Sequence, residues 1–256
     1  MFVEERQALI IEELQEKGRV KVKELSARFK VTADLIRKDL TALEEAGQLK
    51  KTYGGAVAIK ENVHREMVSQ RKTLNLEAKQ QIAKSALSLI KDDYIVFLDI
   101  STANIELAKL IIQHNIKATI VTNMLDVVNI LVKSNVRVIF IGGELDYSRD
   151  GFVGSLALEM LKHFRFDVAF MGVVGVDVKD NCVTTYMPDD GITKKEILNI
   201  SRKSYMMCEY EKLSQLGNYQ FAKINDFTGI ITNKKLLAYD KKILNKYNID
   251  LVESNK

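Results

Sequence analysis

Short apolar runs alternate with amphipathic segments over most of the chain. Apolar runs occupy residues 94–98, 118–122, 136–141 and 168–174, and the segments between them carry apolar residues at helical spacing. Strands of a parallel sheet are buried on both faces and read as continuous apolar runs, and helices connect them. We therefore predict an α/β domain over 77–256 with a mostly parallel sheet and helices on both faces. The predicted helices cover 79–90, 105–112, 124–133 and 156–164, and the alternation continues through 194–201, 205–208, 229–232 and 236–246.

The first 58 residues have a different pattern, typical of three short helices. Apolar residues recur at helical spacing up to Gly18, and a third helix is predicted from an N-cap at Thr32 to a stop at Gly47. The second helix is expected to bury Val22, Leu25, Ala27 and Phe29. Tight connections and a basic third helix indicate a helix-turn-helix, although the periodicity also allows an inert helical bundle.

A basic segment with a double glycine follows the third helix. Lys50 and Lys51 precede Tyr53, Gly54 and Gly55. Glycine lets a backbone approach phosphates closely, so this segment is interpreted as the wing of a winged helix-turn-helix.

Nucleic-acid contacts are expected at the start of the third helix and on the wing. Arg37 is the candidate for a base edge and Lys38 for a phosphate, whereas Asp39 is expected to brace Arg37 or a neighbouring basic residue. The alternative for Arg37 is a surface ion pair with Asp34. The predicted DNA-binding residues are Thr32, Ala33, Asp34, Arg37, Lys38, Lys50, Lys51, Tyr53 and Gly54.

Bulk composition is compatible with this interpretation. The net charge of +4 permits a nucleic-acid partner, and no window has the roughly 18 apolar residues of a membrane span. The two cysteines, Cys182 and Cys208, are too few for a disulfide framework and are expected to be reduced core residues. We expect a cytoplasmic protein without a metal site, and a polar linker over 59–76.

Polar residues follow four of the predicted strands. The strand ends carry hydroxyl, amide, glycine and carboxylate groups, which together suit a small polyhydroxylated anion. Each end taken alone is also compatible with an ordinary turn, and Ser101-Thr102 with a simple helix cap. These residues are Asp99, Ser101 and Thr102, then Thr122 and Asn123, then Gly142 and Gly143, and finally Gly175 and Asp177.

A further segment carries two adjacent lysines. Thr193 and Glu196 have the spacing of a capping box, which would place Lys194 and Lys195 in the first turn of a helix. Cations there oppose the helix dipole, so Lys194 is a candidate for anion binding; alternatively, both lysines point to water.

The chain resembles the DeoR family of bacterial sugar-metabolism regulators over almost its whole length. In the first part the matching residues are Arg6, Leu25, Val31, Ile36-Arg37-Lys38-Asp39-Leu40, Leu43-Glu44, Gly47 and Tyr53-Gly54-Gly55-Ala56-Val57. In the second part they are Lys79, Ile82-Ala83, Asp99-x-Ser101-Thr102, Thr122-Asn123, Gly142-Gly143-Glu144-Leu145, Gly151-x-Val153-Gly154, Asp167-x-Ala169-Phe170, Gly175-Val176-Asp177 and Lys212.

The resemblance implies an effector domain similar in fold to ribose 5-phosphate isomerase and CoA-transferase-like proteins. It also implies a phosphorylated sugar as effector, bound by the strand-end residues together with Lys194 and Lys212. The chain departs from the family at Leu35, where threonine is usual, and at Ile100 and Asn181, where glycine is common.

Two functions are compatible with the sequence. The first is a repressor of a carbohydrate-utilisation operon that binds double-stranded operator DNA as a homodimer or homotetramer and is released by a phosphorylated sugar. The second is a sugar-phosphate isomerase with a fused helical module, in which Asp99, Glu144 or Asp177 would serve as base. The loop 175–179 lacks a second adjacent carboxylate, so we expect no catalysis and no cofactor.

Overall fold

The computed structural model describes residues 3–46, 48–57, 68–146 and 150–254. The chain forms two compact units, 1–60 and 61–256. The expected linker 59–76 falls partly outside the described residues, and the described part contains α4 (Val68–Thr73).

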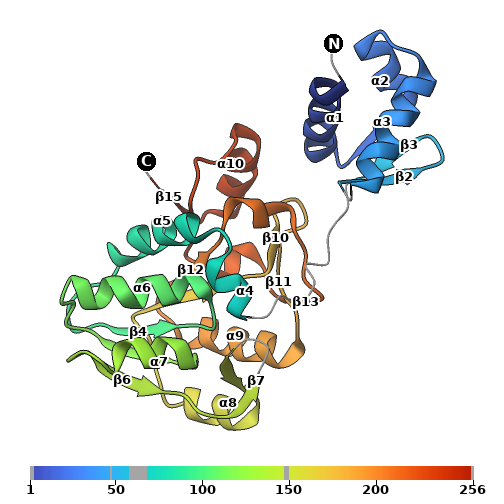
Figure 1. Ribbon diagram of the computed structural model, residues 1–256. Coiled ribbons are helices and arrows are strands. Elements are labelled where there is room, and N and C mark those ends of the chain that lie inside the picture. The colour runs from blue at the N-terminus through green and yellow to red at the C-terminus, as the bar shows by residue number, and fades with distance from the viewer. Residues whose placement is uncertain (1–2, 47, 58–67, 147–149, 255–256) are drawn as a thin grey trace. The chain divides into compact units, whose positions relative to one another are not determined.

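The first unit contains three helices and a small antiparallel sheet (Figure 1). The strand order is β1-β3-β2, so β3 pairs with both neighbours. Strand β1 was not predicted, because three residues with two lysine or arginine side chains show no strand period. The elements are α1 (Val3–Lys17), β1 (Arg19–Lys21), α2 (Val22–Phe29), α3 (Ala33–Glu45), β2 (Lys50–Thr52) and β3 (Gly55–Val57).

Local chemistry ends α1 and begins α3 where the sequence predicts, whereas the predicted stop at Gly47 lies outside the described residues. Gly18 ends α1 with a φ of 72°, and its N–H donates to the Leu14 carbonyl at 2.8 Å. The Thr32 hydroxyl accepts from the Leu35 N–H at 3.3 Å and caps α3. One expectation is wrong: Ala27 is exposed, because α2 turns Leu25 and Phe29 inward and Ala27 lies on the other side.

A buried ion pair fastens α1 to α3. Arg6 donates from Nε and Nη2 to the two carboxylate oxygens of Asp39, at 2.6 and 3.0 Å, and each side chain is 3% exposed. Asp39 therefore braces Arg6, which lies 33 positions away in the sequence, and not Arg37.

The second unit is built on a seven-stranded, fully parallel sheet. Its order is β15-β14-β12-β9-β4-β5-β6, which confirms the predicted α/β class. The strands are β4 (Ile95–Leu98), β5 (Thr119–Thr122), β6 (Arg137–Phe140), β9 (Val168–Gly172), β12 (Ser204–Met207), β14 (Gly229–Thr232) and β15 (Asp250–Glu253). The helices besides α4 are α5 (Leu76–Leu87), α6 (Thr102–Gln113), α7 (Leu125–Leu131), α8 (Ser155–Leu161), α9 (Pro188–Ile200) and α10 (Ala238–Leu244).

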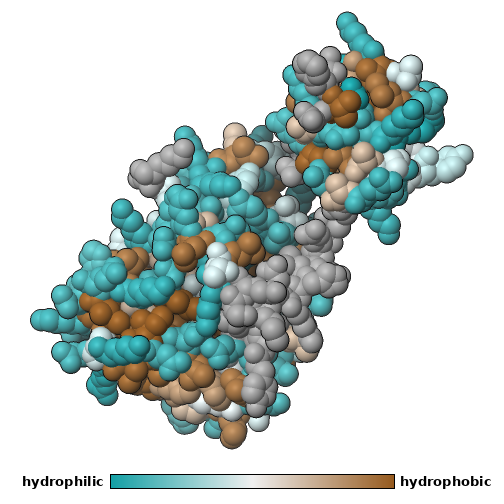
Figure 2. All heavy atoms as spheres, viewed as in Figure 1, coloured by the Kyte–Doolittle hydropathy of each residue, from teal (hydrophilic) through white to brown (hydrophobic). Residues whose placement is uncertain are grey.

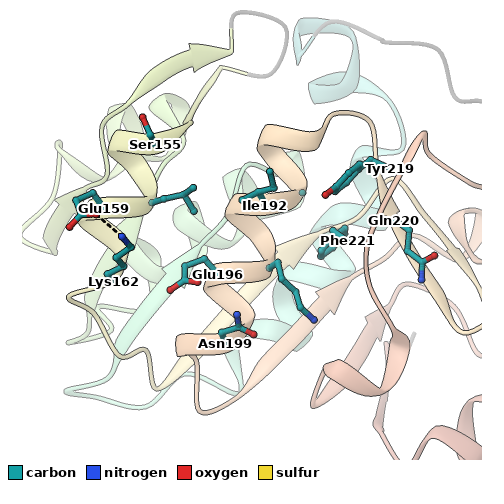
Figure 3. Close-up of a pocket in the computed structure, with 12 residues that line it drawn as sticks. Ser155, Glu159, Lys162, Ile192, Glu196, Asn199, Tyr219, Gln220 and Phe221 are labelled. Atoms are coloured by element: carbon teal, nitrogen blue, oxygen red, sulfur yellow. Dashed lines mark hydrogen bonds and ion pairs between the residues drawn. The ribbon is translucent and has the colours of Figure 1, made fainter.

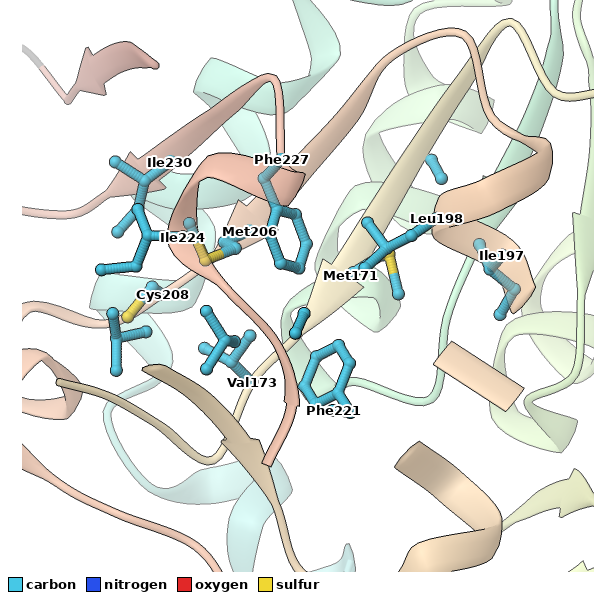
Figure 4. Packing of buried hydrophobic residues seen from close by; sticks show 14 of the residues in the cluster. Met171, Val173, Ile197, Leu198, Met206, Cys208, Phe221, Ile224, Phe227 and Ile230 are labelled. Carbon is cyan, nitrogen blue, oxygen red and sulfur yellow. The ribbon is translucent and has the colours of Figure 1, made fainter. Parts of the chain in front are cut away.

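Helices cover both faces of the sheet. Helices α5, α6 and α7 lie side by side on one face (Figure 1), and their inward side chains form one core with strand residues such as Leu98 and Phe170. Hydrophilic side chains cover much of their outer surface in Figure 2. The second core, shown in Figure 4, packs Met171, Met206 and Ile230 of the sheet against α9 and against Phe221.

Two small antiparallel units were not predicted. One pairs β7 (Glu144–Asp146) with β8 (Gly151–Val153). The other has the order β10-β11-β13 and consists of β10 (Gly175–Asp177), β11 (Cys182–Thr185) and β13 (Tyr219–Ala222). Both consist of strands of three or four residues, too short for a clear alternation of polar and apolar side chains.

Candidate functional site

The N-terminal half of α3 presents basic side chains to solvent. Arg37 and Lys38 are exposed, as expected for residues that contact DNA. Arg37 Nη1 lies 2.5 Å from Asp34 Oδ1, so the alternative ion pair does form. The two side chains are 62% and 83% exposed, however, and such a pair contributes little free energy. Arg37 can therefore exchange Asp34 for a base or phosphate acceptor at small cost.

The wing is a tight β2–β3 hairpin. Thr52 pairs with Gly55, which leaves Tyr53 and Gly54 at the tip, where Tyr53 is fully exposed. A Cβ on Gly55 would lie 1.9 Å from the Val20 carbonyl oxygen, whereas a Cβ on Gly54 would meet nothing within 4 Å. Gly55 is thus required by packing against β1, and of the two glycines only Gly54 has open space around it.

The predicted DNA-binding residues lie on α3 with its cap and on the wing. Ala33 is half-buried, Thr32 and Asp34 are exposed, and Lys50 is exposed on β2. Lys51 instead joins the wing to α3: its Nζ donates to the Thr41 hydroxyl and its N–H to Glu44, both at 2.8 Å.

The parallel sheet reverses its direction of growth between β4 and β9. The chain adds β5 and β6 on one side of β4, and then β9, β12, β14 and β15 on the other. Ligands of such sheets bind outside the carboxyl ends of the strands at this switch point. Asp99 follows β4, and Gly172 ends β9. The Gly172 N–H donates to Asp99 Oδ2 at 3.1 Å, and a Cβ on Gly172 would lie 2.5 Å from Ser101 Cβ.

Asp99 is the centre of a buried acidic cluster. Lys194 of α9 donates to Asp99 Oδ2 and lies 3.4 Å from Asp190 Oδ1. Burial raises the pKa of Asp99, although the charge of Lys194 opposes this shift. Asp99 Oδ1 has no hydrogen-bond partner among the described residues.

The position of Lys194 differs from the one predicted. Helix α9 begins at Pro188, so Thr193 and Glu196 form no capping box and Lys194 lies in the helix interior. Lys194 is 3% exposed and is shared by two carboxylates, whereas Lys195 is half-buried and pairs with Asp226. The cluster of Asp99, Asp190 and Lys194 therefore holds two carboxyl groups and one amino group.

Other predicted effector residues surround this cluster. Ser101 caps α6, accepting from the Ala103 N–H at 3.3 Å, and Thr102 is buried beside it. Asn104, which sequence reasoning missed, donates to the carbonyls of Asp99 and Phe170, both at 2.9 Å, and so ties β4 to β9.

The next two strand ends are partly structural. Thr122 donates to the Leu98 carbonyl at 2.6 Å and caps the following turn by accepting from the Met124 N–H at 3.1 Å. Asn123 donates to the Phe152 carbonyl at 2.8 Å, which attaches the β7–β8 hairpin. The Oδ1 atoms of Asn123 and Asn104 are buried and have no partner among the described residues. Gly142 and Gly143 follow β6 and are half-buried.

Two residues at which the chain departs from the resemblance have structural roles. Ile100 is 6% exposed and packs against Gly151, where a Cβ would lie 2.3 Å from Ile100 Cδ1. Asn181 has a φ of 51°, the left-handed region that glycine otherwise fills, and its side chain accepts from the Ile224 N–H at 2.8 Å. Asn181 therefore lies in the β10–β11 turn without disturbing the strand ends.

Gly175 and Asp177 follow β9 in the chain but do not form a loop at its end. They form β10 of the small sheet, and a Cβ on Gly175 would lie 2.1 Å from the Gln215 carbonyl oxygen. The Asp177 carboxylate accepts from the N–H groups of Lys179 and Asp180, at 3.0 and 3.1 Å, and so closes the hairpin turn.

A second cluster, which we call the cationic cluster, lies beyond β9 at the end of β12. It consists of Lys79, Lys212, Arg71 and Glu209. Lys212 Nζ lies 3.2 Å from Glu209 Oε1, and Asn75 donates to Glu209 Oε2 at 2.8 Å. Burial would raise the pKa of Glu209, but the charges of Lys212 and Lys79 and the Asn75 hydrogen bond lower it. Sequence periodicity does not reveal this cluster, because its members come from α4, α5 and the segment after β12.

Two hollows in the described part of this unit are lined mainly by residues outside the Asp99 cluster and the cationic cluster. One, of about 1000 Å³, is lined by Asn75 and Asn233 and so adjoins the cationic cluster. The other, of about 480 Å³, lies between α8, α9 and β13, where Ile192, Tyr219 and Phe221 face it (Figure 3).

The two cysteines differ in burial. Cys208 is buried, as predicted, and burial raises the pKa of its thiol to about 12, whereas the prediction of a core residue is wrong for Cys182, which is only half-buried. No helix among the described residues is long and apolar enough to cross a membrane.

Comparison with known proteins identifies both units. A family model described as the DeoR-like helix-turn-helix domain matches residues 6–62, and one described as the DeoR C terminal sensor domain matches residues 74–234. The lactose phosphotransferase system repressor of Staphylococcus epidermidis is 31% identical over 234 residues, which cover 90% of this chain and 92% of that protein. The glycerol-3-phosphate regulon repressor of Escherichia coli is 28% identical over 243 residues, which cover 94% and 95%.

Among solved structures, ribose 5-phosphate isomerase A from Methanocaldococcus jannaschii aligns with 54% of this chain and 54% of its own. The TM-score is 0.40 at 16% identity, and this partial likeness carries no conclusion about function.

Proposed function

Since the chain belongs to the DeoR family of transcriptional regulators, we propose that it represses a carbohydrate-utilisation operon and leaves its operator when a phosphorylated sugar binds the second unit. The family also decides between the two functions considered from the sequence: the chain is a regulator and not a sugar-phosphate isomerase.

Operator recognition is assigned to α3 and the wing. The start of the second helix of a helix-turn-helix enters the major groove, where the Arg37 guanidinium fits the two acceptors of guanine. Lys38 and Lys50 meet phosphates, as does the backbone at Gly54. Recognition of two symmetric half-sites requires at least two copies of the chain, so the operator is a pseudo-palindrome.

The observation that carries the effector assignment is the pairing of a carboxyl-rich cluster with a cluster rich in basic side chains at one edge of the sheet. The Asp99 cluster holds two carboxyl groups and one lysine, and the cationic cluster holds three basic side chains and one carboxyl group. Glu209 and Asp99 follow β12 and β4, which lie on either side of β9, so their backbones are about 10 Å apart at the spacing of adjacent strands. A phosphorylated sugar has an anionic end and a hydroxylated end, and so matches both.

The buried acceptors favour the same chemistry. Asp99 Oδ1, Asn104 Oδ1 and Asn123 Oδ1 need donors, which sugar hydroxyls supply. The relatives named for the lactose phosphotransferase system and the glycerol-3-phosphate regulon support an effector of this class.

The test is fluorescence anisotropy on DNA from upstream of this gene, at fixed salt, with a panel of sugar phosphates as second titrant. We expect specific binding that one compound reverses. Thr102→Ala should leave DNA binding unchanged and lower the affinity for that compound, because Thr102 lies beside the Asp99 cluster. Specific DNA binding that no sugar phosphate reverses would refute the proposed class of effector. Equal affinity for operator and random DNA would refute the proposed role as a repressor.

A further inference from the structure

Helix α4 is held on the second unit by Lys79. This helix is the first described element after residue 57, so it is where the chain from the wing joins the second unit. Lys79 of α5 donates from Nζ to the main-chain carbonyls of Arg71 and Leu74, at the C-terminal end of α4. The last carbonyls of a helix lack partners within it, so Lys79 supplies the donors that this end needs.

The same ammonium group belongs to the cationic cluster. Lys79 is 3% exposed, and burial lowers its pKa. The charge of Glu209 raises that pKa, whereas those of Lys212 and Arg71 lower it further. Lys79 is thus a buried ammonium group that is bonded to neutral carbonyls and lies near two cations, Lys212 and Arg71, as well as the carboxylates of Glu209 and Glu106.

We propose that Lys79 is a switch that holds α4 on the second unit only while the anion site is empty. The proposal rests on the function proposed above and describes how anion binding at that site would affect the DNA-binding unit. A phosphate group at the cationic cluster attracts the ammonium more strongly than neutral carbonyls do, because a hydrogen bond between two charged groups is the stronger one. The phosphate also repels the partial negative charge of the α4 carbonyls. Both effects weaken the bonds from Lys79 to Arg71 and Leu74.

A second attachment of α4 is partly solvated. Lys72 Nζ lies 2.5 Å from Asp126 Oδ2, with the side chains 39% and 19% exposed. Such a pair holds a helix of six residues less firmly than a buried ammonium does. Loss of the Lys79 bonds therefore weakens the attachment of α4 to the second unit.

Freeing α4 changes how the DNA-binding unit is tethered. The connecting chain then extends from residue 58 to the start of α5 instead of ending at Val68. In a dimer, a longer tether lowers the effective concentration of the second DNA-binding unit once the first has bound. Anion binding at the second unit would weaken operator binding in this way without any change in α3.

The experiment is hydrogen exchange of the full chain, measured by mass spectrometry with inorganic phosphate as the probe. Sodium chloride at equal ionic strength is the control for screening. We expect phosphate to speed exchange in α4 by about tenfold, the effect of losing one buried hydrogen bond, and to leave α1 and α3 unchanged. Lys79→Met should speed exchange in α4 without phosphate and remove the response, and Lys79→Arg should retain part of it. Lys84→Met, an exposed site on the same helix, should behave as wild type.

Calorimetric titration of phosphate distinguishes failure of the switch from failure of the proposed effector site. Phosphate that binds the wild-type protein without faster exchange in α4 overturns the switch and leaves the proposed effector site standing. Phosphate that does not bind overturns the switch and also counts against a phosphorylated effector at this site. Since both measurements are made on the wild-type chain, a Lys79→Met protein that fails to fold does not rescue the proposal.

Discussion

Helix α3 carries two aspartates that each pair with an arginine, one buried and one exposed, and substituting each aspartate should separate the contributions of the two pairs. Asp39 and Arg6 are each 3% exposed and share two hydrogen bonds, whereas Asp34 and Arg37 are 83% and 62% exposed. Asp39→Asn leaves the Arg6 charge buried without a counter-charge, which costs about 3–5 kcal/mol. Asp34→Asn loses an exposed pair worth about 0.2–1 kcal/mol.

The cost at Asp39 is comparable to the whole stability of a unit of this size. At about 0.05–0.15 kcal/mol per residue, the 60 residues of the first unit are stable by about 3–9 kcal/mol. Asp39→Asn should therefore unfold much of this unit and abolish operator binding, although Asp39 does not face DNA.

Hydrogen exchange of the α1 and α3 amides measures this unit separately from the second one. Exchange should accelerate by about 150- to 4000-fold in Asp39→Asn and by less than about tenfold in Asp34→Asn. The double variant Arg6→Met with Asp39→Leu should regain most of the stability, because it leaves no unpaired charge. Equal, small effects of the two aspartate substitutions would refute the argument from burial.

Three further predictions concern the wing, the recognition helix and the pH response. In anisotropy titrations, Arg37→Ala should lower operator affinity by about 1–3 kcal/mol and relax sequence discrimination at one base position; an equal loss of affinity for random DNA would instead assign Arg37 to a phosphate. Lys38→Ala should lower the affinity for all DNA sequences alike and reduce the slope of affinity against salt concentration by about 1. Gly55→Ala should destabilise the wing because of the Val20 carbonyl, whereas Gly54→Ala should keep thermal stability and weaken DNA binding; normal stability of Gly55→Ala would contradict the packing. The pKa of Glu209 is lowered in the fold, so its contribution is present above its usual pKa near 4.5 and is lost as the pH falls through the folded value. Glu209→Gln should therefore flatten the acid limb of the unfolding free energy against pH, and an unchanged limb would exclude that carboxylate as its source.

Much of the fold follows from local patterns. Helical spacing, Gly18 and Thr32 predict the three helices of the first unit, since caps and periodicity depend on residues a few positions apart. Apolar runs between helices predict the parallel sheet for the same reason. The polar residues after β4, β5 and β6 are visible as well, because they directly follow the runs.

Which of the predicted site residues contact one another depends on the tertiary structure alone. The order of the strands places Asp99 beside Gly172, and the packing of α9 brings Lys194 to Asp99 across 95 positions. Gly175 and Asp177, equally plausible in sequence, pair into another sheet. A period of two or 3.6 residues records only which face of an element is buried. The contacts of Asp39 with Arg6 and of Lys79 with α4 depend on how separate elements pack, and no local pattern encodes them.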